Sequence, residues 1–184
     1  MRYETSELTL PNGRRFILRP LGPDDAEAML AFLKAVSGES PFMIRYPDEI
    51  GFTTAQEEEL LRQRREDPFL VDLAVFTQQG ELIANCCVHR LAETYRMAHR
   101  AELSIAVRKE YWHQGLGTLL TGRAIQAAGA MPGIESLELT AMGKNRRALA
   151  LYKRQGFQKT GELKRGFRYR DGSYDSEVFM VREL

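Results

Sequence analysis

The sequence predicts one α/β domain of the α+β kind, with a mixed, mostly antiparallel sheet of about six or seven strands flanked by about four helices. Strand-type alternation and helix-type periodicity occupy different segments of the chain, and Gly, Pro and turn dipeptides separate these segments. The 184 residues, 43% hydrophobic and 28% charged, suffice for one core but not for two ordinary domains. The domain is therefore expected to span residues 1–184, with its core from about residue 15.

The expected elements interleave along the chain. In order they are a strand, two helices, three strands, a helix, a strand, a helix and a final pair of strands. They are expected over residues 15–21, about 23–38, 54–64, 71–77, 81–91, 100–107, 115–128, 136–140, 145–155 and a hairpin that turns at 171–172. Because strands and helices interleave, the helices are expected to cover the faces of the sheet.

The two N-terminal helices are predicted from their start signals. The first follows Pro23 and carries two acids in its first turn, where the helix dipole favours them. Its apolar residues recur at helical spacing: Ala26, Met29, Leu30 and Leu33. Thr53–Thr54 is expected to supply the cap of the second helix, whose acidic run 57–59 is expected to be a solvated face. Residues 39–52, rich in Pro and Gly, are expected to form a loop.

The later strands are predicted from alternation and from turn residues. Residues 71–77 and 81–91 flank a turn at 78–80 and should pair as antiparallel neighbours. Residues 100–107 alternate, with Leu103, Ile105 and Val107 on one face and Glu102, Ser104 and Ala106 on the other. The Asp-Gly dipeptide at 171–172 is a favoured hairpin turn.

Charge, hydropathy and cysteine usage exclude several classes of protein. Lys plus Arg (26) nearly balances Asp plus Glu (25), and a net charge of +1 argues against a nucleic-acid binder. No apolar stretch approaches the ~18 residues of a membrane-spanning helix, and residues 1–10 show no secretory leader. Cys86 and Cys87 are adjacent and would point to opposite faces of a strand, so neither a disulfide nor a cysteine metal site is expected. A reducing, cytoplasmic location is expected.

The most informative segment is residues 107–120, where a strand runs into a loop with Gly115 and Gly117 before a helix begins. Glycines let a ligand approach the backbone, and the first N–H groups of a helix point outward without partners at the positive end of its dipole. The segment therefore predicts a site for a phosphorylated group. A Walker A loop is disfavoured because Arg123–Ala124 stands in place of Lys-Ser/Thr. A Rossmann fingerprint is disfavoured because Leu120 stands in place of the third glycine. A plain strand–loop–helix without a ligand stays the alternative.

A second segment, residues 145–157, carries polar groups on one helical stripe. Asn145, Ala148 and Tyr152 lie one above the other over two turns. Asn145 offers an amide, Tyr152 offers a phenol, and the small Ala148 leaves room between them. The alternative is an amphipathic helix in which Tyr152 is half-buried core and Asn145 is a cap.

Together the two segments resemble the GCN5-related N-acetyltransferase superfamily. Its acetyl-CoA signature is Gln/Arg-x-x-Gly-x-Gly/Ala after the fourth strand, followed downstream by an Asn-x-x-Ala-x-x-x-Tyr helix that ends in Gly-Phe. The sequence matches at Gly115, Gly117, Asn145, Ala148, Tyr152, Gly156 and Phe157. Trp112 stands in the first position in place of Gln or Arg, so no side-chain contact to phosphate is implied there. The resemblance covers the chain from Arg15 onward.

The resemblance implies transfer of an acetyl group from acetyl-CoA to a primary amine by direct attack in a ternary complex. The implied cofactor-binding residues are Ile105, Val107, His113, Gln114, Gly115, Leu116, Gly117, Thr118, Asn145, Ala148 and Tyr152. The strand edge would bond the pantetheine arm and the loop backbone would hold the pyrophosphate. Tyr152 would protonate the departing thiolate, although a phenol with a reference pKa of about 10 is a weak donor. No metal is implied.

Glu102 is the candidate for the general base that deprotonates the amine. It projects from the strand that leads to the glycine loop, and some members of the superfamily use a glutamate on this strand. The alternatives are a strand-face carboxylate paired with Arg90 or Arg100, and a relay of the proton through waters, as in many relatives. His113 is expected to be a loop residue near the phosphates rather than the base.

Charge clusters suggest where the ligands meet the surface. Residues 144–170 hold ten basic residues and one acid, which either speed the capture of polyanionic coenzyme A or form a solvated face. Residues 39–67 hold eight acids and four bases, and an acidic rim there would suit a cationic acceptor.

The acceptor is the least defined ligand. Residues 167–175 resemble relatives that acetylate small amino acids or the N-termini of ribosomal proteins, while polyamines and aminoglycosides stay open. A noncatalytic CoA-binding sensor on the same fold is the alternative function. Because dimers occur in the family, the resemblance suggests a homodimer. Neither a membrane nor a nucleic acid is expected as a partner.

Overall fold

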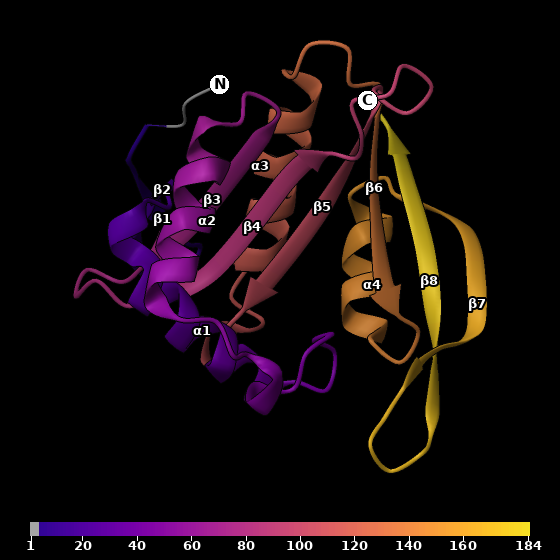
Figure 1. Ribbon diagram of the computed structural model, residues 1–184, viewed down its shortest axis with the longest axis horizontal. Coiled ribbons are helices and arrows are strands. Elements are labelled where there is room, and N and C mark those ends of the chain that lie inside the picture. Colours follow the sequence, from indigo (N-terminus) through magenta and orange to yellow (C-terminus); the bar gives the residue numbers. More distant parts are fainter. Residues whose placement is uncertain (1–3) are drawn as a thin grey trace.

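The structure, a computed structural model, describes residues 4–184, and this part of the chain forms eight strands and four α-helices (Figure 1). The elements are β1 (Ser6–Thr9), β2 (Arg15–Pro20), α1 (Ala26–Glu39), α2 (Thr54–Glu66), β3 (Leu70–Phe76), β4 (Leu82–Arg90), β5 (Arg100–Val107), α3 (Leu116–Gly129), β6 (Ser136–Met142), α4 (Arg146–Arg154), β7 (Gln158–Arg168) and β8 (Tyr174–Glu183). The expected class and the order of elements from residue 15 onward are confirmed. Residues 1–3 belong to the predicted domain and to the segment expected to lack a leader, and they lie outside the described residues.

The strands form one sheet in the order β1-β2-β3-β4-β5-β6-β8-β7. Neighbouring strands are antiparallel except β5 and β6, which are parallel. The sheet has one strand more than the upper number predicted, because β1 precedes the first expected strand. β1 and β2 form a hairpin whose turn contains Gly13 at φ +82°, a left-handed conformation that glycine adopts without strain.

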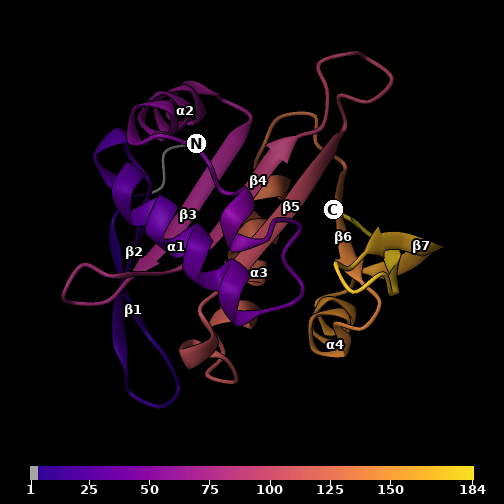
Figure 2. The same cartoon turned by 60° about the horizontal axis from the view of Figure 1, so that its bottom comes forward.

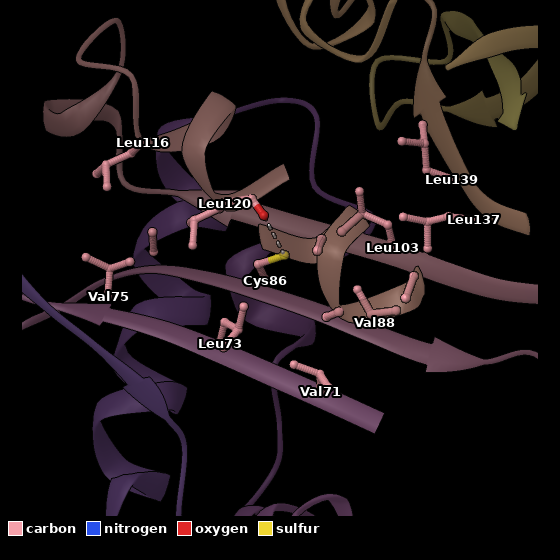
Figure 3. Packing of buried hydrophobic residues seen from close by; sticks show 14 of the residues in the cluster. Val71, Leu73, Val75, Cys86, Val88, Leu103, Leu116, Leu120, Leu137 and Leu139 are labelled. Carbon is pink, nitrogen blue, oxygen red and sulfur yellow. Dashed lines mark hydrogen bonds between the residues drawn. The ribbon is translucent and has the colours of Figure 1, made fainter. Parts of the chain in front are cut away.

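Helices cover both faces of the sheet (Figures 1 and 2). α1 and α2 pack on one face, where Phe32 and Leu61 meet Ala74 and Phe76 of β3 in one buried cluster. α3 packs on the other face, where Leu116 and Leu120 join a larger cluster. Figure 3 shows this second cluster, with Val71, Leu73 and Val75 of β3 beside Cys86 and Val88 of β4.

In β5, and at the two adjacent cysteines of β4, successive side chains point to opposite faces of the sheet. Leu103 joins the α3-side cluster, while Ala106 packs against the cluster below α1. The expected division of β5 into two faces is therefore confirmed. Cys86 and Cys87 are free thiols, both buried.

The sheet opens between β5 and β6. The two strands pair only over Arg100–Glu102 and Ser136–Glu138, whereas β4 pairs with β5 as far as Val107. From Leu103 onward, β5 has no strand on its β6 side within residues 4–184. Unpaired strand edges offer backbone N–H and C=O groups to another extended chain, so this opening can accept an elongated ligand.

Helix α2 confirms one expectation and corrects another. Thr53 caps it, since its Oγ1 accepts a hydrogen bond from the Gln56 N–H at 3.2 Å. The acidic run 57–59 is not entirely a solvated face, because Glu57 is only 3% exposed while Glu58 and Glu59 are exposed. Burial raises the pKa of Glu57, while Arg64 nearby opposes the shift and Asp72 adds to it. None of the described helices has the length and apolarity to cross a membrane.

Candidate active site

The loop before α3 presents its backbone to a cleft. Gly115 caps the helix in a left-handed conformation with φ +92°, and His113 is also left-handed with φ +61°. The Leu119 N–H donates to the Gly115 carbonyl at 3.0 Å, so the preceding first-turn amides, Leu116–Thr118, have no helical acceptor. This geometry places free N–H groups and the positive end of the α3 dipole at one spot.

We call the space before α3 the loop cleft, with a volume of about 340 Å³. Its walls include ten of the eleven residues predicted for cofactor binding: Ile105, Val107, His113, Gly115, Leu116, Gly117, Thr118, Asn145, Ala148 and Tyr152. The fold thus brings the strand end, the glycine loop and the stripe of α4 together. Arg147 and Arg154 also line the loop cleft, and no Asp or Glu of the described chain does. Such a lining suits a polyanion.

Two of the predicted residues can act only through their backbone. The Gln114 side chain accepts a hydrogen bond from Arg14 at 3.0 Å and donates one to the Glu110 carbonyl at 2.8 Å. It is thus held away from the loop cleft, which it does not line. The Leu116 side chain is 1% exposed and belongs to the core.

Helices α3 and α4 approach closely beside the loop cleft. A Cβ atom placed on Gly117 would lie 3.1 Å from Leu151 Cδ1, a tighter contact than most side chains make. The Gln155 side-chain amide donates to the Thr118 carbonyl at 3.3 Å. Gly117 therefore has a packing role as well as its position at the start of α3.

Trp112 and Arg147 form a pair that the sequence did not reveal. The Trp112 indole N–H donates to the Val107 carbonyl at 2.7 Å, which holds the end of β5. The Arg147 guanidinium lies 3.6 Å from the centre of the Trp112 ring. Burial lowers the pKa of Arg147, but an arginine stays charged at neutral pH. Where the family signature has Gln or Arg, this chain therefore has an aromatic ring that carries a cation from α4.

A second space, the inter-strand cavity, lies between the diverging strands and has a volume of about 360 Å³. Glu102–Ile105 of β5 and Thr140–Met142 of β6 line it, together with part of the 39–52 loop. It shares six wall residues with the loop cleft: Phe42, Met43, Ile105, Asn145, Ala148 and Tyr152. Two ligands that occupied the two spaces would meet at these residues.

Tyr152 stands where the two spaces join. It is 8% exposed and packs edge-on against Phe157 at 5.9 Å between ring centroids. Burial raises the pKa of Tyr152 well above its ordinary value, and the neighbouring Cys86 adds to the shift. The phenol therefore keeps its proton at neutral pH and can donate a hydrogen bond.

Asn145 caps α4. Its Oδ1 accepts a hydrogen bond from the Ala148 N–H at 3.2 Å. The cap uses the oxygen of the side-chain amide, so the NH₂ group is the part that could bind a ligand. Cap and ligand contact are therefore compatible, although the sequence offered them as alternatives.

Glu102 lines the inter-strand cavity and lies 3.6 Å from His89 Nε2. Both side chains are about 40% exposed. The alternative pairing with Arg90 or Arg100 is wrong, because Arg100 binds Glu138 on β6 and Arg90 lies 3.6 Å from Glu93. Cross-strand register places His89 opposite Glu102, which explains the pair.

The C-terminal hairpin reaches over the inter-strand cavity and contacts the 39–52 loop. The Arg170 N–H donates to the Tyr46 hydroxyl at 3.1 Å, and the Arg170 guanidinium lies 4.0 Å from the Tyr46 ring centre. The same guanidinium donates to Asp48 at 2.8 Å. Phe167, at the end of β7, lines the cavity.

The prediction of an acidic rim is wrong, because the acidic residues do not surround either space. Glu57, Glu58 and Glu59 line neither space, and Asp48 is paired with Arg170. The basic run 144–170 is divided by α4, because Arg147 and Arg154 face the loop cleft while others line a separate groove beside β7 and β8. That groove is lined by Lys144, Arg146, Lys153 and Lys159.

The family model described as Acetyltransferase (GNAT) family matches residues 37–157, more than half of the chain, including the glycine loop and α4. The chain belongs to the GNAT acetyltransferase family. This membership confirms the resemblance that the glycine loop and the Asn-Ala-Tyr stripe indicated.

A curated relative and several solved structures resemble this GNAT chain. The uncharacterized N-acetyltransferase YoaA of Bacillus subtilis is 28% identical over 102 residues, which are 55% of each chain, so the match spans about half the length of that relative. The GNAT-family acetyltransferase of Streptococcus pneumoniae has a similar structure, with 29% identity and a TM-score of 0.86 over 92% of this chain and 99% of that one. The yncA protein of Salmonella typhimurium, solved with its cofactor acetyl-CoA, shares the fold at 16% identity, with a TM-score of 0.78 over 92% of this chain and 94% of its own.

Proposed function

We propose that this GNAT protein transfers the acetyl group of acetyl-CoA directly to the nitrogen of a primary amine in a ternary complex. The observation that carries the proposal is the meeting of two separate spaces at Tyr152. One space has free backbone amides and arginines suited to a polyanionic cofactor. The other is closed by strand and loop side chains and has one carboxylate, Glu102.

In this proposal the loop cleft holds acetyl-CoA. The pyrophosphate accepts hydrogen bonds from the N–H groups between His113 and Thr118, with Gln114 and Leu116 contributing only backbone. The pantetheine arm lies along β5 at Ile105 and Val107, where β6 no longer pairs with the strand, and the Asn145 NH₂ donates to it. The family and the acetyl-CoA complex of a fold neighbour support this cofactor.

Chemistry in this proposal occurs at the junction of the two spaces. The protonated amine first gives up a proton, to Glu102 or to a water near it, because only the free amine attacks a carbonyl. A bond forms between the amine nitrogen and the acetyl carbon. The nitrogen then gives up a second proton to water, the carbon–sulfur bond breaks, and coenzyme A leaves as a thiolate. Tyr152 stabilises the developing thiolate. Since burial raises its pKa, we infer that Tyr152 donates a hydrogen bond and that the thiolate takes its final proton from water.

Replacing Tyr152 tests this function. Tyr152→Phe keeps the ring packing on Phe157 and removes only the hydroxyl. We expect kcat to fall about 100-fold, a typical loss when one hydrogen bond to a developing negative charge is removed, while acetyl-CoA affinity stays within about two-fold. Release of coenzyme A thiol measures turnover across a panel of amines, and calorimetric titration measures affinity. Tyr95→Phe, on a residue that is 95% exposed, is the matched control.

Two other results would contradict the proposal. Acetyl-CoA binding that no amine converts into thiol release, in wild type and variant alike, would identify a noncatalytic sensor. Equal turnover of Tyr152→Phe and wild type would remove Tyr152 from the mechanism.

We also propose a cytoplasmic location and one functional domain over residues 1–184. The buried free thiols Cys86 and Cys87 support a reducing compartment, and the single sheet that runs from β1 to β8 supports one domain. The homodimer and the absence of nucleic-acid and membrane partners stay predictions.

A further inference from the structure

The inter-strand cavity is walled mainly by apolar side chains from segments far apart in the sequence. Those that matter for the argument are Leu33 of α1, Phe42, Met43, Ile50 and Phe52 of the loop after it, and Phe167 of β7. Apolar walls bind apolar surface, since removing both from water is favourable in proportion to the area covered.

Two large apolar side chains at this cavity are left open to solvent. Ile44 is 78% exposed and Phe52 is 41% exposed, and both line the cavity. A ligand with an apolar body would cover both side chains, whereas a small hydrophilic amine would leave them in water. The exposed pair thus favours a ligand larger and more apolar than a simple polar amine.

The charges around the cavity are few. Glu102 and Arg45 are the only charged residues in its wall within the described chain, and Arg45 lies 5.4 Å from the centre of the Phe52 ring. One carboxylate can balance one ammonium group. A polyamine or an aminoglycoside brings several cations, which would need several carboxylates to replace their hydration.

We propose that the acceptor is a monoamine whose single primary amino group is attached to an aromatic or branched aliphatic body. This inference rests on the proposed function, because it assigns the acceptor of the same reaction. The amino group lies toward Glu102 and Tyr152, and the body lies against Phe42, Phe52 and Phe167. The acidic rim expected over residues 39–67 for a cationic acceptor is absent from the cavity wall within residues 4–184.

A comparison of four amines tests the inference on the intact protein. With saturating acetyl-CoA, thiol release is measured for 2-phenylethylamine and leucinamide, and for spermidine and glycinamide. We expect kcat/KM for each apolar amine to exceed that for each of the other two by about ten-fold or more. Phe52→Ser should raise the KM for 2-phenylethylamine about ten-fold and leave the acetyl-CoA dissociation constant unchanged, since it removes one large apolar contact. Tyr95→Ser, at a residue that lines neither space, should change neither quantity.

The outcomes separate this inference from the function on which it rests. Faster acetylation of spermidine or glycinamide than of both apolar amines would overturn the inference and leave the acetyltransferase function intact. An unchanged KM in Phe52→Ser would also overturn it. Failure to bind acetyl-CoA at all would overturn the proposed function itself.

Discussion

At the scale of single residues, Arg147 of α4 brings a charged group to the position where Trp112 departs from the family signature. Trp112 stands where the family signature has a polar side chain, and the structure brings Arg147 from α4 onto its ring. The guanidinium lies in the wall of the loop cleft, beside the glycine loop. The loop cleft therefore has a guanidinium beside position 112, which comes from Arg147 of α4.

Replacing Arg147 tests whether its guanidinium contributes to acetyl-CoA binding. We expect Arg147→Ala to weaken acetyl-CoA binding about ten-fold, because a hydrogen bond to a charged group contributes about 1.5 kcal/mol. Calorimetric titration gives the affinity. The control is Arg146→Ala, since Arg146 lines the groove on the other side of α4. Equal weakening in both variants would mean that only the net charge of the helix matters.

Glu57 is a residue whose burial the sequence could have revealed. It lies four residues before Leu61, which is 1% exposed, so the two share the inward stripe of α2. The acidic composition of the run 57–59 suggested solvent exposure instead. Glu57 is buried because it lies on the inward stripe of α2, and the acidic composition of the run does not change this.

Burial of Glu57 makes stability depend on pH. Because its pKa is raised in the folded protein, the folded state holds the proton more strongly than the unfolded state, and the free energy of unfolding falls as pH rises through the folded pKa. We expect Glu57→Gln to be more stable than wild type at pH 7, with the difference vanishing toward the ordinary glutamate pKa of about 4.3. Urea unfolding between about pH 4.5 and 8 measures this. Glu58→Gln, at an exposed position, should show no such trend, and a less stable Glu57→Gln at pH 7 would contradict the account.

At the scale of elements, local patterns predicted most of the fold. Turn dipeptides, helix caps and alternation predicted the α-helices and strands from β2 to α4 within a few residues, and the turn of the last hairpin. The missed strand, β1, also had a signal, since Asn12–Gly13 is a typical hairpin dipeptide between β1 and β2. Local patterns could not predict the inter-strand cavity, because it depends on where β5 and β6 stop pairing and on a loop and a hairpin that meet across the fold.

The left-handed conformation of Gly115 at the start of α3 can be tested by substitution. Gly115 has φ +92°, where any other residue is strained, so Gly115→Ala should lower the free energy of unfolding by about 1–2 kcal/mol and weaken acetyl-CoA binding. Gly122, in the middle of the same helix, has open space where a Cβ would lie, with no atom within 4 Å of that position. Gly122→Ala should therefore raise stability by up to about 1 kcal/mol and leave binding unchanged. Denaturant unfolding and calorimetry compare the pair, and similar effects of both substitutions would contradict a special role for Gly115.

At the scale of the whole molecule, the proposed function depends on two adjoining spaces, the loop cleft and the inter-strand cavity. The gap after Glu102 exposes the edge of β5, and α3 and α4 place their N-terminal ends beside it. The C-terminal hairpin then closes the other side by binding the 39–52 loop through Arg170. The wall of the inter-strand cavity thus combines residues 33–52, two strands and Phe167 of the hairpin, which explains why no single motif specifies it.

A crystal structure of the protein with coenzyme A tests the central claim most directly. The account predicts that the pyrophosphate lies within hydrogen-bond distance of backbone nitrogens between residues 113 and 118, with the pantetheine arm along Ile105–Val107 and the thiol beside Tyr152. Coenzyme A bound in the groove lined by Lys144 and Lys159, or no bound coenzyme A at millimolar concentration, would contradict it.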